Sequence, residues 1–338
     1  MKQAELYAPE SMRLIETDIP CPGAGEILIE VRRVGICGSD LHAYHGKHPF
    51  IQLPVVPGHE FSGLVAEVGE NVRDFAPGQR VTVEPSLVCG ECYNCRHNRY
   101  NICENLKVIG CQTTGALGEY LVVPADKVLA IPESVSFDQA ALVEPAAVAV
   151  HAVRKGNMTP GANAYVMGGG TIGLMTLQVA KALGAGKVAI SDLLPDRLSL
   201  ARELGADETI NPRIEDPQSK IQSIFPDGVD IIFECVGVPA TVHEAIRVAR
   251  KGARLILAGV FEEDIPVPLG QVQDRELELI GTLMYQYDDF PTAIELIHSG
   301  QVKADPLISH HFPLEEAARA FSVADSRSGA LKVLIDVS

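Results

Sequence analysis

The sequence predicts a two-domain α/β protein in which a β-rich part is followed by a part built around a parallel β-sheet. Its 338 residues are enough for about two domains. The first third contains short runs with apolar residues at alternate positions, whereas from about residue 145 the chain is rich in alanine and strand-like segments alternate with helix-like ones. The first pattern is typical of half-buried strands, and the second is typical of βαβ units.

The β-rich part is expected to contain several short strands. Ile27, Ile29 and Val31 stand at every second position before Arg32, which predicts a half-buried strand. Further apolar runs predict strands at residues 81–83 and 120–123. Pro-Gly turns separate these runs, at residues 22–23, 57–58 and 77–78.

The middle of the chain follows the order strand, helix, strand. A predicted strand at 164–167 runs into a glycine-rich loop and a helix at 174–183, and a second strand is expected at 187–190. Further on we expect strands at 230–233 and 254–257 with a helix at 241–250, then a helix at 291–298 and a final strand at 332–335. We expect the last segment to rejoin the first domain, so that the divisions are 1–145, 146–283 and 284–338.

Four of the eight cysteines fall within fifteen residues, separated by two, two and seven residues; they are Cys89, Cys92, Cys95 and Cys103. Converging thiolates of this kind suit a closed, tetrahedral structural zinc site. Disulfides or free thiols are the alternatives. The sequence opens without a charged-then-apolar leader, and in a reducing cytosol a dense cysteine cluster is more often a metal site. The isolated Cys21, Cys111 and Cys235 are expected to be ordinary small buried residues.

The composition narrows the classes of function. Hydrophobic residues make up 46% and charged residues 21%, as in an ordinary globular protein. The net charge of −16 opposes binding to nucleic acid, which depends on lysine and arginine, and so argues against a zinc ribbon. No apolar run is long enough for a transmembrane helix. We therefore expect a cytoplasmic protein with no nucleic-acid or membrane partner.

The glycine-rich loop at 168–173 predicts a dinucleotide site, because it follows a strand, precedes a helix and has an acid nineteen residues beyond its last glycine. Gly168 allows a tight turn, Gly170 lets the backbone approach a pyrophosphate, and Gly173 allows the helix to pack closely on the strand. The helix N-terminus, with Thr171 and Ile172, offers free N–H groups to phosphates.

The acid of this site is Asp192, at the end of the second strand. Its carboxylate can accept hydrogen bonds from both ribose hydroxyls and repels a 2′-phosphate, so NAD is expected rather than NADP. Arg197 is expected either to lie near the adenine or to be a solvated helix residue. The alternative for the whole loop is a glycine-rich turn with no nucleotide.

A second, sparser set of metal donors lies in the first domain. Cys37, His59 and Glu60 offer a thiolate, an imidazole and a carboxylate. Three protein ligands leave one position open, which is the arrangement of a catalytic zinc. Taken singly, each of these residues also suits a polar surface or a satisfied core pair.

Together these motifs resemble the zinc-dependent medium-chain dehydrogenases, the family of alcohol, polyol and threonine dehydrogenases. The resemblance spans essentially the whole chain, in the motifs GICGSDLH (35–42), PGHEFSG (57–63), the four-cysteine segment, VEP (143–145), GGGTIG (168–173) and Asp192. It implies a GroES-like catalytic domain, a Rossmann NAD-binding domain, an active site between them, and a homodimer or homotetramer.

The resemblance also implies roles for residues around the open metal set. Glu144 matches an acid that holds the zinc water or exchanges as a ligand in polyol dehydrogenases. Ser39 matches the hydroxyl that takes the substrate proton, and His42 matches the histidine that passes it toward solvent through the ribose. Two zinc ions per chain are then expected, one structural and one catalytic.

The substrate implied is a secondary hydroxyl of a polyol or sugar acid, oxidised to a ketose or keto acid. Glu60 and Glu144 favour this branch of the family, but residues 284–287 (MYQY) depart from the arginine–tyrosine pair of sorbitol dehydrogenases. Lys47 and His48 are candidates for binding a carboxylate, or are exposed loop charges. The alternatives are an L-threonine 3-dehydrogenase, a vicinal-diol dehydrogenase, or a catalytically silent zinc-binding relative; neither the substrate nor its stereochemistry is fixed by these motifs.

Overall fold

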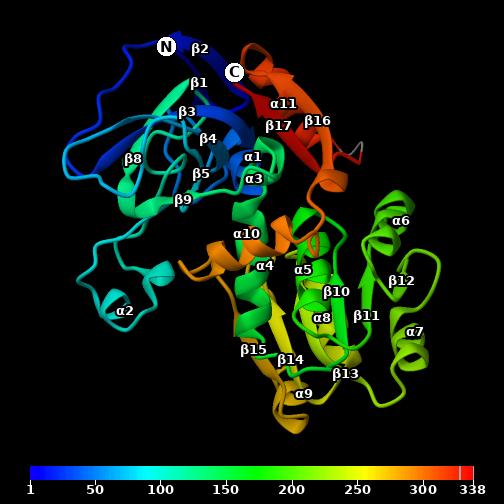
Figure 1. Ribbon diagram of the computed structural model, residues 1–338. Helices are drawn as coiled ribbons and strands as arrows, with labels where there is room; N and C mark the ends of the chain where they lie inside the picture. Colours follow the sequence, from blue (N-terminus) through cyan, green and yellow to red (C-terminus); the bar gives the residue numbers. More distant parts are fainter. Residues whose placement is uncertain (327–328, 338) are drawn as a thin grey trace. The chain divides into compact units, whose positions relative to one another are not determined.

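The computed structural model describes residues 1–326 and 329–337, and its chain divides into two compact units (Figure 1). Unit 1 contains Met1–Glu144, Gln286–His298 and the segment from Ala304 onward. Unit 2 contains Pro145–Tyr285 and Ser299–Lys303. The short segment Ser299–Lys303 therefore packs with unit 2, although the sequence placed it in the returning C-terminal part.

Unit 1 is built around a seven-stranded sheet in the order β16-β17-β3-β4-β5-β9, with β8 also paired to β3. The strands of this sheet are β3 (Glu26–Gly35), β4 (Glu60–Val68), β5 (Arg80–Val83), β8 (Tyr120–Pro124), β9 (Val128–Ala130), β16 (Ile308–Pro313) and β17 (Lys332–Asp336). Two small two-stranded sheets add β1 (Lys2–Ala8) with β2 (Ser11–Glu16), and β6 (Ser86–Leu87) with β7 (Lys107–Val108).

The helices of unit 1 are short and fall between these strands. They are α1 (Gly38–Tyr44), α2 (Tyr93–Arg96), α3 (Phe137–Ala141), α10 (Asp289–His298) and α11 (Ala317–Asp325), with 3₁₀ turns η1 (Tyr100–Ile102), η2 (Ala125–Lys127), η3 (Asp305–Leu307) and η4 (Leu314–Glu316). The final strand β17 pairs with β3, so the C-terminal part of the chain completes the sheet that the N-terminal part begins.

The strand predicted at Ile27 is more deeply buried than its alternation suggested. Ile27 and Ile29 are fully buried as expected, but Leu28 between them is buried too. β3 is an inner strand of the sheet, paired with β4, β8 and β17, and side chains on both of its faces are buried over this stretch.

Unit 2 has a six-stranded parallel sheet in the order β12-β11-β10-β13-β14-β15. Its strands are β10 (Ala164–Met167), β11 (Val188–Ser191), β12 (Glu208–Ile210), β13 (Val229–Glu234), β14 (Ala249–Leu257) and β15 (Glu278–Gly281), and its helices are α4 (Val143–Lys155, whose first two residues belong to unit 1), α5 (Thr171–Ala182), α6 (Pro195–Glu203), α7 (Pro217–Ile224), α8 (Pro239–Val248) and α9 (Leu269–Asp274). Numbered within the unit, this order is 3-2-1-4-5-6, the Rossmann order. Successive strands are first added on one side of the first strand and then on its other side. The predicted parallel sheet is therefore confirmed.

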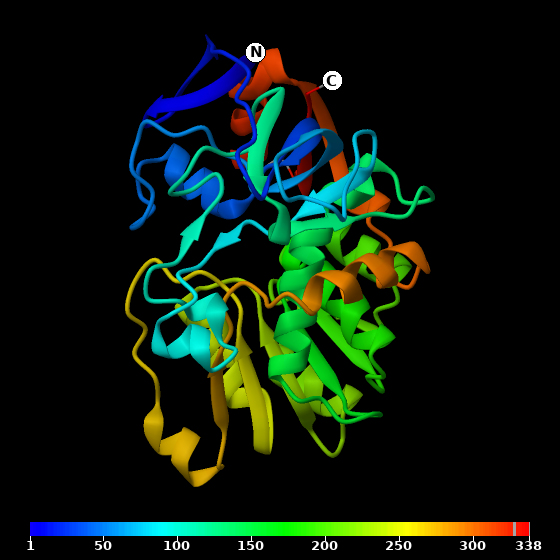
Figure 2. The same ribbon diagram turned by 60° about the vertical axis from the view of Figure 1, so that its left-hand side comes forward.

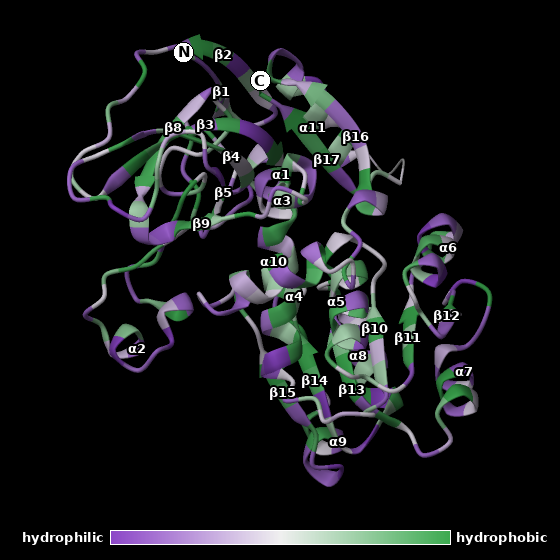
Figure 3. Cartoon of the chain, in the orientation of Figure 1, coloured by the Kyte–Doolittle hydropathy of each residue, from purple (hydrophilic) through white to green (hydrophobic). Residues whose placement is uncertain are grey.

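The core of unit 2 follows from the apolar strands. Hydrophobic residues fill β11 and the second half of β14 (Figure 3), and both are inner strands with a neighbour on each side. One face of the sheet packs Tyr165, Ile232 and Leu255 against α7 and α8. The opposite face meets the end of α4, where a side chain on Gly156 would overlap Ile231. Both faces are thus covered, which explains why these strands read as continuous apolar runs.

The sequence placed some boundaries of unit 2 wrongly and missed other elements. The helix expected at 241–250 ends at Val248, because Ala249 and Arg250 already belong to β14. The helices α6, α7 and α9 were not predicted. The short strands β12 and β15 were missed because three or four residues of strand carry little periodicity. None of the helices in residues 1–326 and 329–337 combines the length and apolar character needed to span a bilayer.

Candidate metal centres and dinucleotide site

The three donors expected to form the open metal site lie together in unit 1. One donor atom from each of Cys37, His59 and Glu60 lies within 4.8 Å of the others. His59 and Glu60 are buried, while Cys37 is only half-buried. One thiol, one imidazole and one carboxylate at these separations suit Zn²⁺ with a position left for a further ligand.

Local backbone structure presents these donors to one another. Cys37 is the N-cap of α1, while His59 and Glu60 stand at the start of β4. Gly58, directly before His59, has a φ of 101°, and a Cβ there would come within 2.7 Å of Val34. Only glycine suits this position, so the PGHE turn sets the direction from which His59 enters the site.

Asp40 supports this set and was not singled out in the sequence. It is almost completely buried, and one carboxylate oxygen accepts a hydrogen bond of 2.8 Å from the backbone N–H of Cys37. The other oxygen lies 3.6 Å from Nδ1 of His59, and neither atom has another hydrogen-bond partner in the described part of the chain. A carboxylate behind a metal-binding histidine fixes the orientation of the ring, which is the arrangement seen here.

The charges of this pair are interdependent. Burial raises the pKa of the Asp40 carboxyl, and the neighbouring His59 opposes that shift. Burial also disfavours the charged imidazolium of His59, yet Asp40 and Cys37 hold the pKa of His59 well above its ordinary value of 6.5. Asp40 and Cys37 therefore favour positive charge at the His59 ring.

Two further side chains approach this cluster. Cys111 is buried as expected, but it also interacts with the His59 ring, so it is a neighbour of the site rather than an isolated core residue. Partial burial, helped by the nearby His42 and His59, lowers the pKa of His48. Lys47 is exposed.

The expectation that Cys21 is buried is wrong, since Cys21 is exposed.

The two residues expected to carry the proton lie on α1. The hydroxyl oxygen of Ser39 is 3.5 Å from Nε2 of His59. His42 follows three residues later, and residues three apart share one side of a helix. Both side chains are half-buried.

Glu144 is close to this centre but stands outside the converging donor set. It is buried in the first turn of α4 and interacts electrostatically with Lys332. Among the described residues, the set of donor atoms within 4.8 Å of one another contains Cys37, His59 and Glu60 and does not extend to Glu144.

The four-cysteine segment forms a separate lobe around α2 and η1. In both Figure 1 and Figure 2 this lobe projects from the β-strands of unit 1. The sulfur atoms of Cys89 and Cys103 are 3.4 Å apart, and those of Cys89–Cys95 and Cys92–Cys103 are 4.0 Å apart. Tetrahedral zinc with Zn–S bonds of about 2.3 Å needs sulfurs about 3.8 Å apart, so the geometry fits.

The backbone favours the thiolate at some cysteines of this lobe, while burial raises the pKa of Cys95 to about 12. All four are free, and backbone N–H groups point at the sulfurs of Cys89, Cys92 and Cys103. The N–H of Cys95, the largest of several causes, lowers the pKa of Cys92 to about 6. A thiolate is the form that binds zinc, and these donors stabilise it.

Residues 284–287 differ from the arginine–tyrosine pair of sorbitol dehydrogenases, and one of them, Gln286, has a structural role in unit 1. The side-chain amide of Gln286 donates to the carbonyl of Asn98 at 2.7 Å, and it lies 3.3 Å from the side-chain oxygen of Asn101. Both partners belong to the four-cysteine lobe. Gln286 therefore fastens the lobe.

In unit 2 the glycine-rich loop follows β10 and begins α5. Gly168 has a φ of 100°, and a Cβ on Gly173 would collide with the carbonyl of Gly168. Gly170 is the N-cap of α5 and faces open space, so the loop leaves room beside the first N–H groups of the helix, those of Thr171 and Ile172. The conformation fits a bound pyrophosphate.

Asp192 lies beside this loop, directly after β11. Its carboxylate accepts hydrogen bonds from the N–H of Gly169 at 2.7 Å and of Leu194 at 2.8 Å. Arg197 reaches to 3.6 Å from the same carboxylate, and its Cβ lies against Gly169. Each carboxylate oxygen can accept further bonds, so Asp192 remains able to bind hydroxyl groups.

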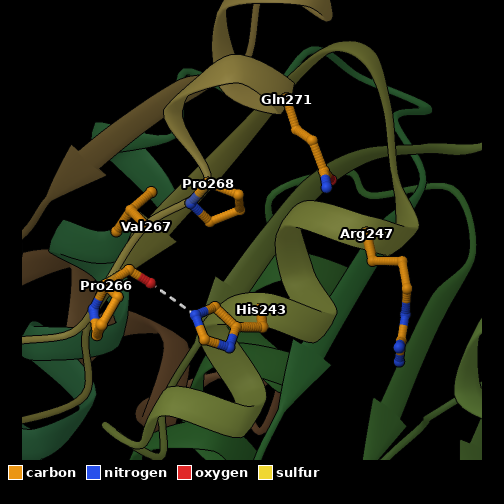
Figure 4. A pocket seen from close by; sticks show the side chains of 6 residues that line it. All are labelled: His243, Arg247, Pro266, Val267, Pro268 and Gln271. Atoms are coloured by element: carbon orange, nitrogen blue, oxygen red, sulfur yellow. Dashed lines mark hydrogen bonds between the residues drawn. The ribbon is translucent and has the colours of Figure 1, made fainter.

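A pocket of about 470 Å³ on unit 2 lies away from these motifs in the sequence (Figure 4). It is lined by α8 and the chain at 266–271, and Nε2 of His243 bonds the carbonyl of Pro266 at 2.6 Å. It includes none of the residues predicted to bind a metal or a dinucleotide.

Comparison with known proteins places the chain in a family. Residues 23–133 match the alcohol dehydrogenase GroES-like domain, and residues 171–299 match the zinc-binding dehydrogenase domain. The chain is 35% identical to sorbitol dehydrogenase of Bacillus subtilis (strain 168), covering 99% of this chain and 97% of that protein. It is 37% identical to 2-dehydro-3-deoxy-L-galactonate 5-dehydrogenase of Pseudoalteromonas atlantica, covering 99% and 98%. A solved structure from Sinorhizobium meliloti 1021, bound to NADP, is 34% identical with a TM-score of 0.94, covering 99% of each chain.

The chain belongs to the zinc-dependent medium-chain alcohol and polyol dehydrogenases, with a GroES-like domain and a Rossmann domain. It is accordingly an oxidoreductase with zinc and NAD as cofactors, which agrees with the donor sets of unit 1 and the glycine-rich loop of unit 2.

Proposed function

We propose that this enzyme oxidises a secondary hydroxyl of a polyol or sugar acid, with NAD as acceptor, to a ketose or keto acid. The carrying observation is the concentration of buried carboxylates at the open metal site: Asp40, Glu60 and Glu144 all lie there with little exposure. Carboxylate oxygens can each accept more than one hydrogen bond, so this polar surrounding suits a substrate with neighbouring hydroxyl donors better than a bare alkyl chain. The sorbitol and galactonate dehydrogenases among its relatives act on such compounds, as their names state.

Cys37, His59 and Glu60 are proposed to hold a catalytic Zn²⁺, and the cysteine lobe a structural one, giving two per chain. A bound zinc would supply polarisation of the substrate hydroxyl, and NAD, which the loop 168–173 would hold with Asp192 and Arg197, would supply the hydride acceptor. Ser39 takes the proton from the hydroxyl, and His42, one turn along α1, receives it and passes it outward.

Glu144 and His48 are proposed to orient the substrate. Glu144 is outside the converging donors, so it is better placed to accept a hydrogen bond from a hydroxyl or a water than to be a permanent ligand. The lowered pKa of His48 favours a neutral imidazole, which has one donor and one acceptor and so suits a hydroxyl group.

A screen of NADH formation tests the substrate class. We expect kcat/KM to be highest for a polyol or an aldonate among polyols, aldonates, threonine, butanediol and simple alcohols. If threonine or butanediol is the best substrate, the enzyme belongs to the corresponding amino-alcohol or diol branch. If ethanol or another primary alcohol exceeds every polyol and sugar acid, the branch assignment is wrong. No turnover of any of them would support a catalytically silent relative.

Asp192 is expected to set the choice of cofactor. A carboxylate at this position binds the ribose hydroxyls and repels a phosphate, so kcat/KM with NAD should exceed that with NADP by at least about tenfold. Asp192→Ala should bring the two values together, whereas Asp196→Ala, at an exposed position four residues further on, should not. Similar kcat/KM values for both cofactors in the unaltered enzyme would refute this role.

We also propose a cytoplasmic homodimer or homotetramer. Light scattering should then give two or four times the chain mass of 36.3 kDa.

A further inference from the structure

Lys332 is a buried cation that reaches the open metal site from the last strand of the chain. Its ammonium group donates to the carboxylate of Glu60 and, at 3.0 Å, to the carbonyl of Ile36, the residue before Cys37. The side chains of Lys332 and Glu60 are only 4% and 1% exposed. A buried ammonium group without such partners would be strongly unfavourable, so this contact is a built feature of unit 1.

The sheet itself creates the contact. Gly35 in β3 pairs with Glu60 in β4 on one side and with Leu334 in β17 on the other. A Cβ on Gly35 would collide with the carboxylate of Glu60 and would lie 3.3 Å from the side chain of Lys332. The missing side chain at Gly35 is therefore what lets Glu60 and Lys332 meet across three strands.

Glu60 is consequently shared between two cations. One of its oxygens is bound by Lys332, while the residue also belongs to the donor set with Cys37 and His59. A carboxylate oxygen that accepts a hydrogen bond from an ammonium group has less negative charge available for a metal. The positive charge of the ammonium group also opposes Zn²⁺ in a low-dielectric surrounding.

We propose that Lys332 is a positioning residue, which holds the Glu60 carboxylate and restrains it from binding zinc fully. The inference rests on the proposed zinc site at Cys37, His59 and Glu60. This restraint would leave a zinc ion bound there more weakly held than its three protein donors alone would hold it. The ion would then be a stronger Lewis acid toward the substrate hydroxyl.

This role and a purely structural role predict opposite changes in the rate of zinc release when Lys332 is removed. If Lys332 only supported the sheet, its removal would loosen the site and zinc would leave faster. If Lys332 restrains Glu60, its removal frees the carboxylate for the metal and zinc should leave more slowly.

The test follows zinc release from the holoenzyme to a colorimetric chelator. Lys332→Met is expected to slow the faster phase, that of the open site, by at least about tenfold, and to leave the slower phase of the cysteine lobe unchanged. Lys332→Arg should behave as the unaltered enzyme. Lys127→Met is the matched control, because Lys127 is a buried lysine of the same unit that pairs with another acid, Glu84, at 3.5 Å; it should not slow the faster phase.

A second comparison separates positioning from simple repulsion. In a Glu60→Gln background the slowing caused by Lys332→Met should shrink, because the shared carboxylate is gone. Equal slowing in both backgrounds, or faster or unchanged release in Lys332→Met, would overturn the proposal. If Lys332→Met does not fold, Lys332→Gln, which retains a donor for Ile36, replaces it. Persistence of the faster phase in Cys37→Ser would instead refute the zinc site itself.

Discussion

Replacing Cys37 with serine is expected to reduce zinc from two ions per chain to one and to lower kcat by at least about 10³. Cys37 supplies the thiolate of the open site, and loss of zinc removes several kcal/mol of stabilisation of developing charge. The four-cysteine site has its own donors and should keep its ion. Metal analysis and initial rates measure both effects.

Cys21→Ser is the control for this variant, since Cys21 is an exposed, free cysteine. It should retain two zinc ions and full activity. A single zinc in the unaltered enzyme, unchanged by Cys37→Ser, would show that the open site does not bind zinc.

Ser39→Ala is expected to lower kcat by about 10² or more while both zinc ions stay bound. Ser39 is the hydroxyl next to His59, and without it the substrate proton has no first acceptor. Ser11→Ala, at the first residue of β2, should have no effect on the rate. The measurement is kcat over a range of pH, together with metal content.

His42→Ala should cost less than Ser39→Ala, because water or an added buffer base can take the last proton in place of His42. Exogenous buffer should therefore restore part of the rate. A Ser39→Ala enzyme with normal kcat and normal pH dependence would rule out the relay.

Much of the fold could be predicted because its signals are local. The loop 168–173 combines a strand, glycines at fixed spacing and a helix, and the structure shows the positive φ of Gly168 and the close contact of Gly173 that this spacing requires. The four cysteines converge as their spacing implied. Short elements such as β12 carry too few residues to show periodicity and were missed.

The rest of the site depends on contacts between distant parts of the chain. Lys332 meets Glu60 across 272 positions of sequence, and no local pattern around residue 332 marks that pairing. Cys111 beside His59 is a similar case. Asp40 was within reach, because it stands inside the GICGSDLH motif, but its role becomes clear only when it is seen behind the His59 ring.

Hydride transfer from a secondary carbon to NAD can be followed with an isotope. The best substrate from the screen is prepared with deuterium at the reacting carbinol carbon and oxidised by the enzyme with NAD in ordinary water. We expect one deuterium at the nicotinamide C4 of the reduced cofactor, found by mass spectrometry, with none lost to solvent. Unlabelled NADH, with deuterium released into water, would contradict it.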